Sequence, residues 1–378
     1  MSDIRTQQLR AVVFGNGMGM LPPLMGRFRQ FFGEVHFAEP KYPTAYKWFY
    51  LFWSVRPGKL AWYRNWKRYM ESSPSSFRVW TRACARSLDA LHGKFDVILH
   101  LGAQNSPGWK PDKPVFIFTD SCRRLSSLNQ HDESCAFRHA QEEREWFSLE
   151  GDVYRNARRI FVGSQFVKDA LVGFYGVPDH RVVVTGFGAG AAFGELVTKQ
   201  FDGKTILYIG KGDFEKKGGV VLLEAFRKVR EEIPDAVLHV VGQHALPMQV
   251  EGVVNEGFIT DRTKLIALMR AAHVFTLPSL VDRFGIALVE AMATSTPCVT
   301  SSYGAMPEVV GDAGLVVPSN DADALAAALI RLLRNEAESR EMGLRGRVRF
   351  ERKYNWDTIW ELISSEIRQG LNEAAAGQ

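Results

Sequence analysis

Residues Pro278–Glu308 read PSLVDRFGIALVEAMATSTPCVTSSYGAMPE, and this stretch indicates the class of fold. The apolar run Val274–Leu277 before it predicts a buried strand. Within it, Ile286–Thr294 predicts a helix and Pro297–Thr300 predicts a second strand. A helix between two short apolar strands is typical of a parallel sheet with helices on its faces. The stretch therefore predicts an α/β domain whose ligands bind at the carboxyl ends of the strands.

The same alternation continues on both sides of this stretch. In the second half of the chain, further strands and helices are predicted at Ile206–Ile209, Gly219–Glu232, Val237–Val241, Arg262–Ala272, Leu315–Val317, Ala322–Arg334, Ser339–Phe350 and Trp356–Arg368. In the first half they are predicted at Ala11–Phe14, Phe95–Leu99, Val115–Phe118, Ala140–Phe147, Ile160–Val162, Gln165–Phe174 and Arg181–Val184. Two α/β halves of similar length predict two Rossmann-like, doubly wound domains with a ligand cleft between them.

The composition sets limits on partners and location. A chain of 378 residues suggests two domains, and its net charge of +5 is too small to indicate nucleic acid. The four cysteines show no C-x-x-C spacing, which predicts reduced thiols in a cytoplasmic protein. We see no signal peptide and no apolar run long enough to span a membrane.

Two carboxylates mark the stretch quoted first. Asp282 lies in its loop, and Glu290 is the single charged residue of the helix IALVEAMA. A buried carboxylate must be paired or hydrogen-bonded, and the adjacent hydroxyls of a ribose or hexose would satisfy both acids. Alternatively, Glu290 pairs with a buried Arg or Lys and Asp282 stabilises the start of the helix. The strand, the apolar helix and the paired spacing together favour the sugar.

A basic loop follows the first strand of the second half. The segment Leu207–Gly219, LYIGKGDFEKKGG, carries Lys211, Lys216 and Lys217 among glycines that let a ligand approach the backbone. Lysines at such a loop suit a diphosphate, although a solvated charged loop is the simpler alternative. The Walker pattern G-x-x-x-x-G-K-[ST] is absent.

The pattern P-S-x-x-[DE]-x-F-G-x-x-x-x-E-A-M-A resembles glycosyltransferase family 4, whose members have the GT-B fold. The resemblance implies that Glu290 holds the ribose hydroxyls of a nucleotide-sugar donor. It implies that Asp282 contacts the hydroxyls of the transferred sugar. Backbone amides near Phe284, Gly285 and Ile286 would contact the same donor.

The resemblance also extends to the basic loop and to the chemistry. It implies that Lys211 and Lys217 hold the donor diphosphate, with Lys216 able to replace either, and that Gly257–Thr260 faces the nucleobase. It implies a UDP- or GDP-sugar donor and retention of anomeric configuration, and we separately predict no required metal or other cofactor. Two departures stand out: Asp282 replaces the commoner Glu, and Arg283 replaces a Gly.

The domains follow from the pattern and the resemblance. We expect an N-terminal acceptor-side domain over residues 1–186, a Gly- and Ala-rich linker over 187–203 and a donor-binding domain over 204–355. Residues 356–378 resemble the family's terminal helix, which crosses back onto the first domain. Asp321-Ala322-Asp323 fits a D-x-D metal motif, but its place at a helix start predicts capping instead.

The acceptor side offers weaker candidates. Gly15 and Gly17 follow the first strand, either close to the reaction centre or as an ordinary tight turn. Asp120 ends another strand where the family often has a catalytic His. His100 is a second candidate, although most lone histidines at strand ends are structural.

Residues 41–70 hold eleven aromatic residues and seven basic ones without an acidic residue. This composition predicts peripheral docking at the inner face of a membrane, which would bring the enzyme to a lipid-linked acceptor. The alternative is an insertion that packs its aromatic side chains into the core.

The sequence thus predicts a retaining glycosyltransferase that acts on a glycan or lipid-linked acceptor in polysaccharide or glycolipid biosynthesis. Two alternatives are a sugar-nucleotide epimerase on the same fold and a non-catalytic protein that binds sugar nucleotides.

Overall fold

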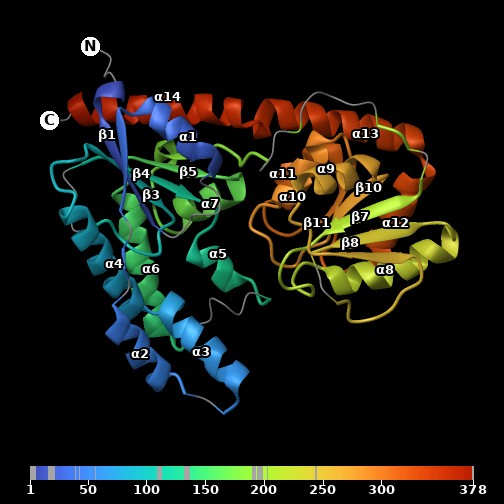
Figure 1. Ribbon diagram of the computed structural model, residues 1–378, viewed down its shortest axis with the longest axis horizontal. Helices are drawn as coiled ribbons and strands as arrows, with labels where there is room; N and C mark the ends of the chain where they lie inside the picture. The colour runs from blue at the N-terminus through green and yellow to red at the C-terminus, as the bar shows by residue number, and fades with distance from the viewer. Residues whose placement is uncertain are drawn as a thin grey trace. The chain divides into compact units, whose positions relative to one another are not determined.

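The computed structural model describes residues 6–15, 22–38, 40–41, 43–55, 57–108, 113–131, 137–189, 193, 199–201, 203–242 and 245–376. The chain divides into two compact units. Unit 1 comprises Met1–Thr185 and Trp360–Gln378, and unit 2 comprises Gly186–Ile359. Each unit contains one six-stranded sheet with helices beside it (Figure 1). This arrangement confirms the predicted pair of α/β domains.

The sheet of unit 1 is parallel throughout and has the order β2-β1-β3-β4-β5-β6. Its strands are β1 (Arg10–Gly15), β2 (Glu34–Phe37), β3 (Val97–Leu101), β4 (Val115–Thr119), β5 (Arg159–Val162) and β6 (Val182–Val184). The sequence analysis missed β2, and it placed β3 too early. The strand order reverses between β1 and β3, where open α/β sheets bind ligands.

The helices of unit 1 are α1 (Pro22–Phe31), α2 (Thr44–Trp53), α3 (Lys59–Ser72), α4 (Pro74–Asp89), α5 (Arg123–Leu128), α6 (Ala140–Arg155) and α7 (Gln165–Gly173). Helix α14 (Trp356–Ala376) begins in unit 2, and its residues from Trp360 onward belong to unit 1. There Glu366 and Glu373 accept hydrogen bonds from Arg159 of β5, whose side chain is 2% exposed.

Helices α2 and α3 are fixed to each other and to α4. The indole Nε1 of Trp62 donates to the Leu51 carbonyl at 2.9 Å, and the amide of Asn65 donates to the Ser54 carbonyl at 2.8 Å. A small apolar cluster separate from the main core then joins the three helices, formed by Tyr46, Trp66, Tyr69, Met70, Val79 and Trp80.

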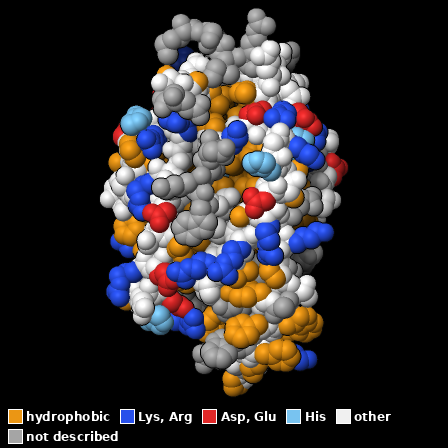
Figure 2. Space-filling model, turned by 90° about the vertical axis from the view of Figure 1, so that its left-hand side faces the viewer, with side chains coloured by type: hydrophobic (Ala, Val, Ile, Leu, Met, Phe, Trp, Pro, Cys, Tyr) orange, Lys and Arg blue, Asp and Glu red, His pale blue; other side chains and the backbone are white. Residues whose placement is uncertain are grey.

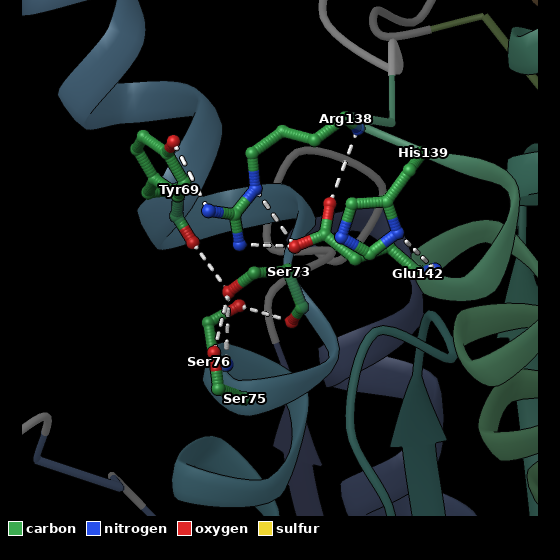
Figure 3. A network of polar contacts seen from close by, with 7 residues as sticks. All are labelled: Tyr69, Ser73, Ser75, Ser76, Arg138, His139 and Glu142. Atoms are coloured by element: carbon green, nitrogen blue, oxygen red, sulfur yellow. Dashed lines mark hydrogen bonds and ion pairs between the residues drawn. The ribbon is translucent and has the colours of Figure 1, made fainter. Parts of the chain in front are cut away.

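A polar network connects the turn between α3 and α4 to the start of α6 (Figure 3). The guanidinium of Arg138 donates to Glu142 Oε1 at 2.8 Å and to the Tyr69 hydroxyl at 3.2 Å, and lies 4.5 Å from the Tyr69 ring centroid. Ser73 donates to the Tyr69 carbonyl and caps α4 by accepting the Ser76 amide. The α2–α3 pair is therefore anchored at its base by both apolar and polar contacts.

Some aromatic residues of 41–70 pack into the protein and others are exposed, so the segment shows features of both alternatives, core packing and membrane docking. Tyr69 is buried, and Tyr46 and Trp66 pack beside it in the small cluster. Four others are largely exposed: Trp48 at 56%, Phe49 at 56%, Phe52 at 73% and Tyr63 at 55%. In the described part of the chain, no helix has the length and apolar character needed to cross a membrane.

The sheet of unit 2 is also parallel, with the order β12-β11-β10-β7-β8-β9. Its strands are β7 (Thr205–Ile209), β8 (Val237–Val241), β9 (Val253–Gly257), β10 (Val274–Leu277), β11 (Cys298–Ser301) and β12 (Gly314–Val317). Chain order runs outward from β7 to β9, then restarts at β10 on the other side of β7. The sheet therefore has its ligand-binding switch point between β7 and β10.

The helices of unit 2 are α8 (Gly219–Glu232), α9 (Arg262–Ala271), α10 (Ile286–Ala293), α11 (Met306–Val310), α12 (Ala322–Arg334) and α13 (Glu336–Arg349). Apart from α11, which the sequence analysis missed, and the start of α13, which it placed three residues late, they follow the predicted pattern. Asp321 Oδ1 accepts the amide of Ala324 at 2.9 Å, and Asp323 pairs with Lys228. The D-x-D segment is thus a helix cap, as predicted.

The expected linker, 187–203, has no helix or strand among its described residues, but these residues lie against unit 2. Phe187 packs on Phe284 and Phe193 packs on Phe350. Lys199 is buried and donates to the carbonyls of Met269 and Arg270 and to Thr296. The described residues of this segment therefore pack against unit 2.

Candidate functional site

The switch point of unit 2 is built by two loops that follow adjacent strands. Residues 210–218 follow β7, and residues 278–285 follow β10. Gly218 has a φ of 73°, and a Cβ there would overlap the carbonyl oxygen of Pro278, so this position requires glycine. The amides of Leu280 and Val281 donate to the Lys216 carbonyl at 2.9 and 3.0 Å. Backbone contacts thus hold the two loops together.

This junction brings two predicted site residues into contact. Lys217 Nζ lies 2.7 Å from Asp282 Oδ2. The other oxygen of Asp282 accepts the amides of Phe284 at 3.2 Å and Gly285 at 2.8 Å, at the start of α10. Two of the backbone amides that the resemblance assigns to the donor are therefore occupied by Asp282 in this structure.

Glu290, in the middle of α10, also has a basic partner. Its side chain is 7% exposed, and Oε1 accepts a hydrogen bond from Arg262 Nη2 of α9 at 2.5 Å. Both carboxylates thus have partners of the kind that the simpler reading of the sequence expected. The burial of Glu290 does not by itself require sugar hydroxyls. Its assignment to the donor rests on its position beside the switch point and on the motif.

The remaining basic residues of the loop differ in their surroundings. Lys211 is exposed, and its Nζ lies 5.5 Å from the ring centroid of Phe258, which is 51% exposed just after β9. The Lys216 amide donates to Asp213 Oδ1 at 3.1 Å. Of the three lysines, Lys217 is the one that contacts Asp282, a predicted site residue. Ile286 begins α10 and is 37% exposed.

The candidates in unit 1 lie at its own switch point or close to it. Gly15 ends β1 with a φ of 119°, and a Cβ there would overlap the carbonyl oxygen of Leu101 in β3. This close approach explains the glycine without a ligand. Gly17 lies outside the described residues. Asp120 directly follows β4 and is partly buried.

His100 lies in the core of unit 1. It is fully buried, stacks on Phe14 with ring centroids 4.2 Å apart and contacts Asn105 Oδ1 through Nε2 at 3.1 Å. Burial lowers the pKa of His100 to about 3, so the ring is neutral. This is the structural role that lone histidines usually have.

Sequence reasoning missed Arg262 and Phe258. Arg262 is the first residue of α9, capped by Asp261, and in the sequence it looks like an ordinary exposed helix start. Its pairing with Glu290 joins residues 28 positions apart and has no local signal. Phe258 falls in the segment expected to face a nucleobase, but that expectation concerned the backbone.

Comparison with known proteins identifies relatives of the second half of the chain. Residues 203–335 match the family model described as Glycosyl transferases group 1. A phosphatidyl-myo-inositol mannosyltransferase of Mycobacterium leprae is 39% identical over 167 residues, 42% of this chain and 44% of the relative. An amylovoran biosynthesis glycosyltransferase of Erwinia amylovora is 32% identical over 172 residues, 41% of this chain and 42% of the relative. The matched segments thus span less than half the length of these relatives.

Solved structures resemble nearly the whole chain. A sucrose-phosphate synthase from Thermosynechococcus elongatus has a TM-score of 0.67 at 19% identity and covers 97% of this chain and 100% of its own. A glycosyltransferase from Rickettsia africae has a TM-score of 0.66 at 13% identity, covering 97% of this chain and 99% of its own. The two parallel sheets and these likenesses confirm a two-domain α/β fold of the GT-B type.

Proposed function

We propose that this chain, a glycosyltransferase family 4-like protein of the GT-B fold with a Glycosyl transferases group 1 segment at residues 203–335, is a retaining glycosyltransferase. Its donor is a nucleotide-diphosphate sugar. The observation that carries the proposal is the contact between Lys217 and Asp282 at the switch point of unit 2, directly before the helix that holds Glu290. Basic and acidic groups that meet there suit a ligand with a diphosphate and neighbouring hydroxyls.

Each group has a distinct role in this proposal. Lys217 and Lys211 neutralise the charge that develops on the leaving diphosphate. Asp282 receives the helix amides on one oxygen, and with the other it orients Lys217 and accepts from a sugar hydroxyl. Glu290 accepts from the ribose hydroxyls. Lys216 lies next to the diphosphate position and adds charge there. In unit 1, Asp120 is the candidate for the position where the family often has a catalytic His.

The relatives suggest the class of reaction in more detail. Several of them are named as mannosyltransferases, including an O-antigen chain mannosyltransferase of Escherichia coli. We therefore take GDP-mannose as the first donor to test, with UDP-hexoses beside it. The acceptor is a glycan or a lipid-linked intermediate in polysaccharide or glycolipid biosynthesis.

A donor screen followed by a transfer assay tests this function. Thermal unfolding is measured with GDP-mannose, UDP-glucose, UDP-N-acetylglucosamine and the free nucleotides, and the best donor is then incubated with candidate glycan and lipid acceptors. The expected result is a melting shift for one donor and transfer with the anomeric configuration kept, read by NMR. Isomerised donor in the absence of an acceptor indicates an epimerase. Binding without turnover on any acceptor indicates a non-catalytic binding protein.

Peripheral membrane contact through residues 41–70 is the second part of the proposal. The rings of Trp48, Phe49, Phe52 and Tyr63 are exposed on helices α2 and α3, as the rings of interfacial aromatic anchors are. Pelleting with vesicles compares the wild-type chain with W48S/F52S. The pair F166S/F174S, in α7 and at its C-terminal cap, removes two other exposed aromatic rings as a control. Equal recovery of wild type in the supernatant with and without anionic vesicles would exclude the contact.

A further inference from the structure

A groove lies beside the aromatic helix pair, between the start of α2 and one face of α4. It has a volume of about 460 Å³ and is lined by Pro43, Tyr46, Phe49, Val79, Arg82 and Arg86. This volume is in the range of small-ligand sites, roughly 300–1,000 Å³. One wall is aromatic and aliphatic, and the other carries two guanidinium groups. A groove of this kind suits a molecule with an anionic group next to an apolar part.

The two arginines are not neutralised by acidic neighbours. Arg78, Arg82 and Arg86 form a stripe at intervals of four residues along α4. Arg78 pairs with Glu145 of α6, whereas in the described part of the chain no acidic side chain pairs with Arg82 or Arg86. Arg86 Nε donates to the carbonyl of Arg82 at 3.3 Å, which leaves its terminal nitrogens available.

The spacing of the two arginines fits a single phosphate group. Residues four apart on a helix lie on one face, about 6 Å apart along the axis, so both side chains can reach the same anion. Guanidinium groups bind phosphate oxygens through two parallel hydrogen bonds and are weakly hydrated. Two unpaired arginines over an apolar wall therefore indicate a phosphate that carries a hydrocarbon part.

The surroundings of the groove extend this character. Trp48 and Phe52 project from the same helix as Phe49, and both are more than half exposed. In the view of Figure 2, hydrophobic side chains gather at the lower end of the molecule, where α2 and α3 lie, below a band of Lys and Arg side chains. A band of positive charge above an apolar tip is the arrangement that anionic membrane surfaces attract.

We propose that this groove binds the phosphate of an anionic phospholipid while the exposed rings of α2 enter the bilayer interface. Arg82 and Arg86 hold the phosphate oxygens, and Tyr46, Phe49 and Val79 contact the glycerol and the first methylenes of the acyl chains. The inference deepens the membrane contact proposed above by assigning its lipid chemistry. It does not depend on sugar transfer.

Vesicle co-sedimentation of the full chain tests the groove. Vesicles of phosphatidylcholine alone are compared with an equal mixture of phosphatidylcholine and phosphatidylglycerol, using wild type and R82Q/R86Q. Each arginine near an anionic surface contributes about 1 kcal/mol, and about 1.4 kcal/mol is tenfold, so the double variant should bind mixed vesicles roughly 30-fold more weakly. Binding to phosphatidylcholine alone should change little.

A matched control separates a groove from a general effect of charge. The variant R144Q/R352Q removes the same net charge at two exposed positions, on α6 and near the end of unit 2. It should weaken binding by less than about threefold, because neither of these arginines lines the groove. Equal losses in the two double variants, or no preference of wild type for phosphatidylglycerol, would overturn the assignment.

Two further measurements test whether R82Q/R86Q alters only lipid binding. Urea unfolding should give the same midpoint for R82Q/R86Q and wild type, since both positions are exposed. Melting shifts with nucleotide sugars should also match, because these arginines lie in unit 1, outside the proposed donor site. Arginine-dependent lipid binding in a chain that binds no nucleotide sugar would support the groove and contradict the proposed enzyme.

Discussion

Arg262 Nη2 lies 2.5 Å from Glu290 Oε1 and so neutralises a carboxylate that is only 7% exposed inside an apolar helix. The Nε of Arg262 is buried as well and has no hydrogen-bond partner. The guanidinium thus donates to Glu290 through Nη2, while its Nε remains without an acceptor. Arg262 therefore positions the carboxylate that we propose for the donor ribose.

Removal of Arg262 should therefore affect both stability and donor binding. Breaking a fully buried pair costs about 3–5 kcal/mol, but Arg262 is 41% exposed, so R262A should cost only about 1–2 kcal/mol. The KM for the donor should rise about tenfold with kcat little changed, and R262K should restore part of both. Urea unfolding and steady-state kinetics measure these effects. A drop in kcat alone would contradict the positioning role.

The lysines of the basic loop should differ sharply. Lys217 contacts Asp282, whereas Lys216 contacts Asp213 only through its backbone amide. Loss of one group that stabilises transition-state charge typically costs about 100-fold or more in kcat, so K217M should fall by at least that factor. K216M, with the same change of charge one residue away, should lose much less. Equal kinetic losses would show that only the general charge of the loop matters.

Two substitutions should separate the role of Asp282 as a helix cap from its role in the reaction. D282A removes the acceptor for the amides of Phe284 and Gly285, and loss of such a cap costs about 1 kcal/mol. D282N keeps an oxygen acceptor and should unfold close to wild type, while it loses the ion pair with Lys217. Transfer activity should fall in both variants. Full activity in D282N would remove the carboxylate from the mechanism.

Burial of His100 should make unit 1 sensitive to acid. Its pKa is lowered to about 3, below the ordinary value of 6.5, so the unfolded chain binds an extra proton between these values. Above pH 6.5 this difference has no effect on the unfolding free energy. As pH falls from 6.5 toward 3, proton uptake by the unfolded chain lowers the unfolding free energy by about 1.4 kcal/mol per pH unit. When pH is lowered from 7 to 4, the unfolding free energy of wild type should fall by on the order of 3 kcal/mol more than that of H100Q. Parallel pH profiles in urea would contradict this.

The ion pairs of β5 with α14 predict opposite effects for two kinds of substitution. The E366Q/E373Q variant leaves the buried guanidinium of Arg159 without a counter-charge and should cost about 2–3 kcal/mol. R159M replaces the charge with a side chain of similar length and should be close to neutral, because the glutamates can turn to solvent. Chemical unfolding of the two variants measures the difference. A larger loss in R159M would show that the pairs stabilise the fold outright.

The sequence was most informative where burial is continuous. The apolar runs of β7, β8 and β10 are buried on both faces, and the bounds predicted for α8 and α12 agree with the structure. The missed strands β2 and β9 are edge strands whose residues are partly or largely exposed, and they carry too little apolar character to be recognised. Edge strands pair on one side only, so polar residues are tolerated there.

The candidate site was predictable by residue type but not by pairing. The motif and the basic loop gave Asp282, Glu290 and Lys217 as candidates. Their partners could not be found in this way, because the contacts between Lys217 and Asp282 and between Arg262 and Glu290 join separate loops and helices. Such contacts depend on strand order, which no local pattern contains.

The attachment of α14 to β5 has a consequence for synthesis. Arg159 leaves the ribosome 207 residues before Glu366 and 214 before Glu373. At ~5–20 residues per second, the nascent first unit waits between roughly 10 and 40 s with this guanidinium unneutralised and with its sheet uncovered where the last helix will dock. The N-terminal unit is therefore completed only after the residues of the second unit have been made, even though most of its strands emerge early.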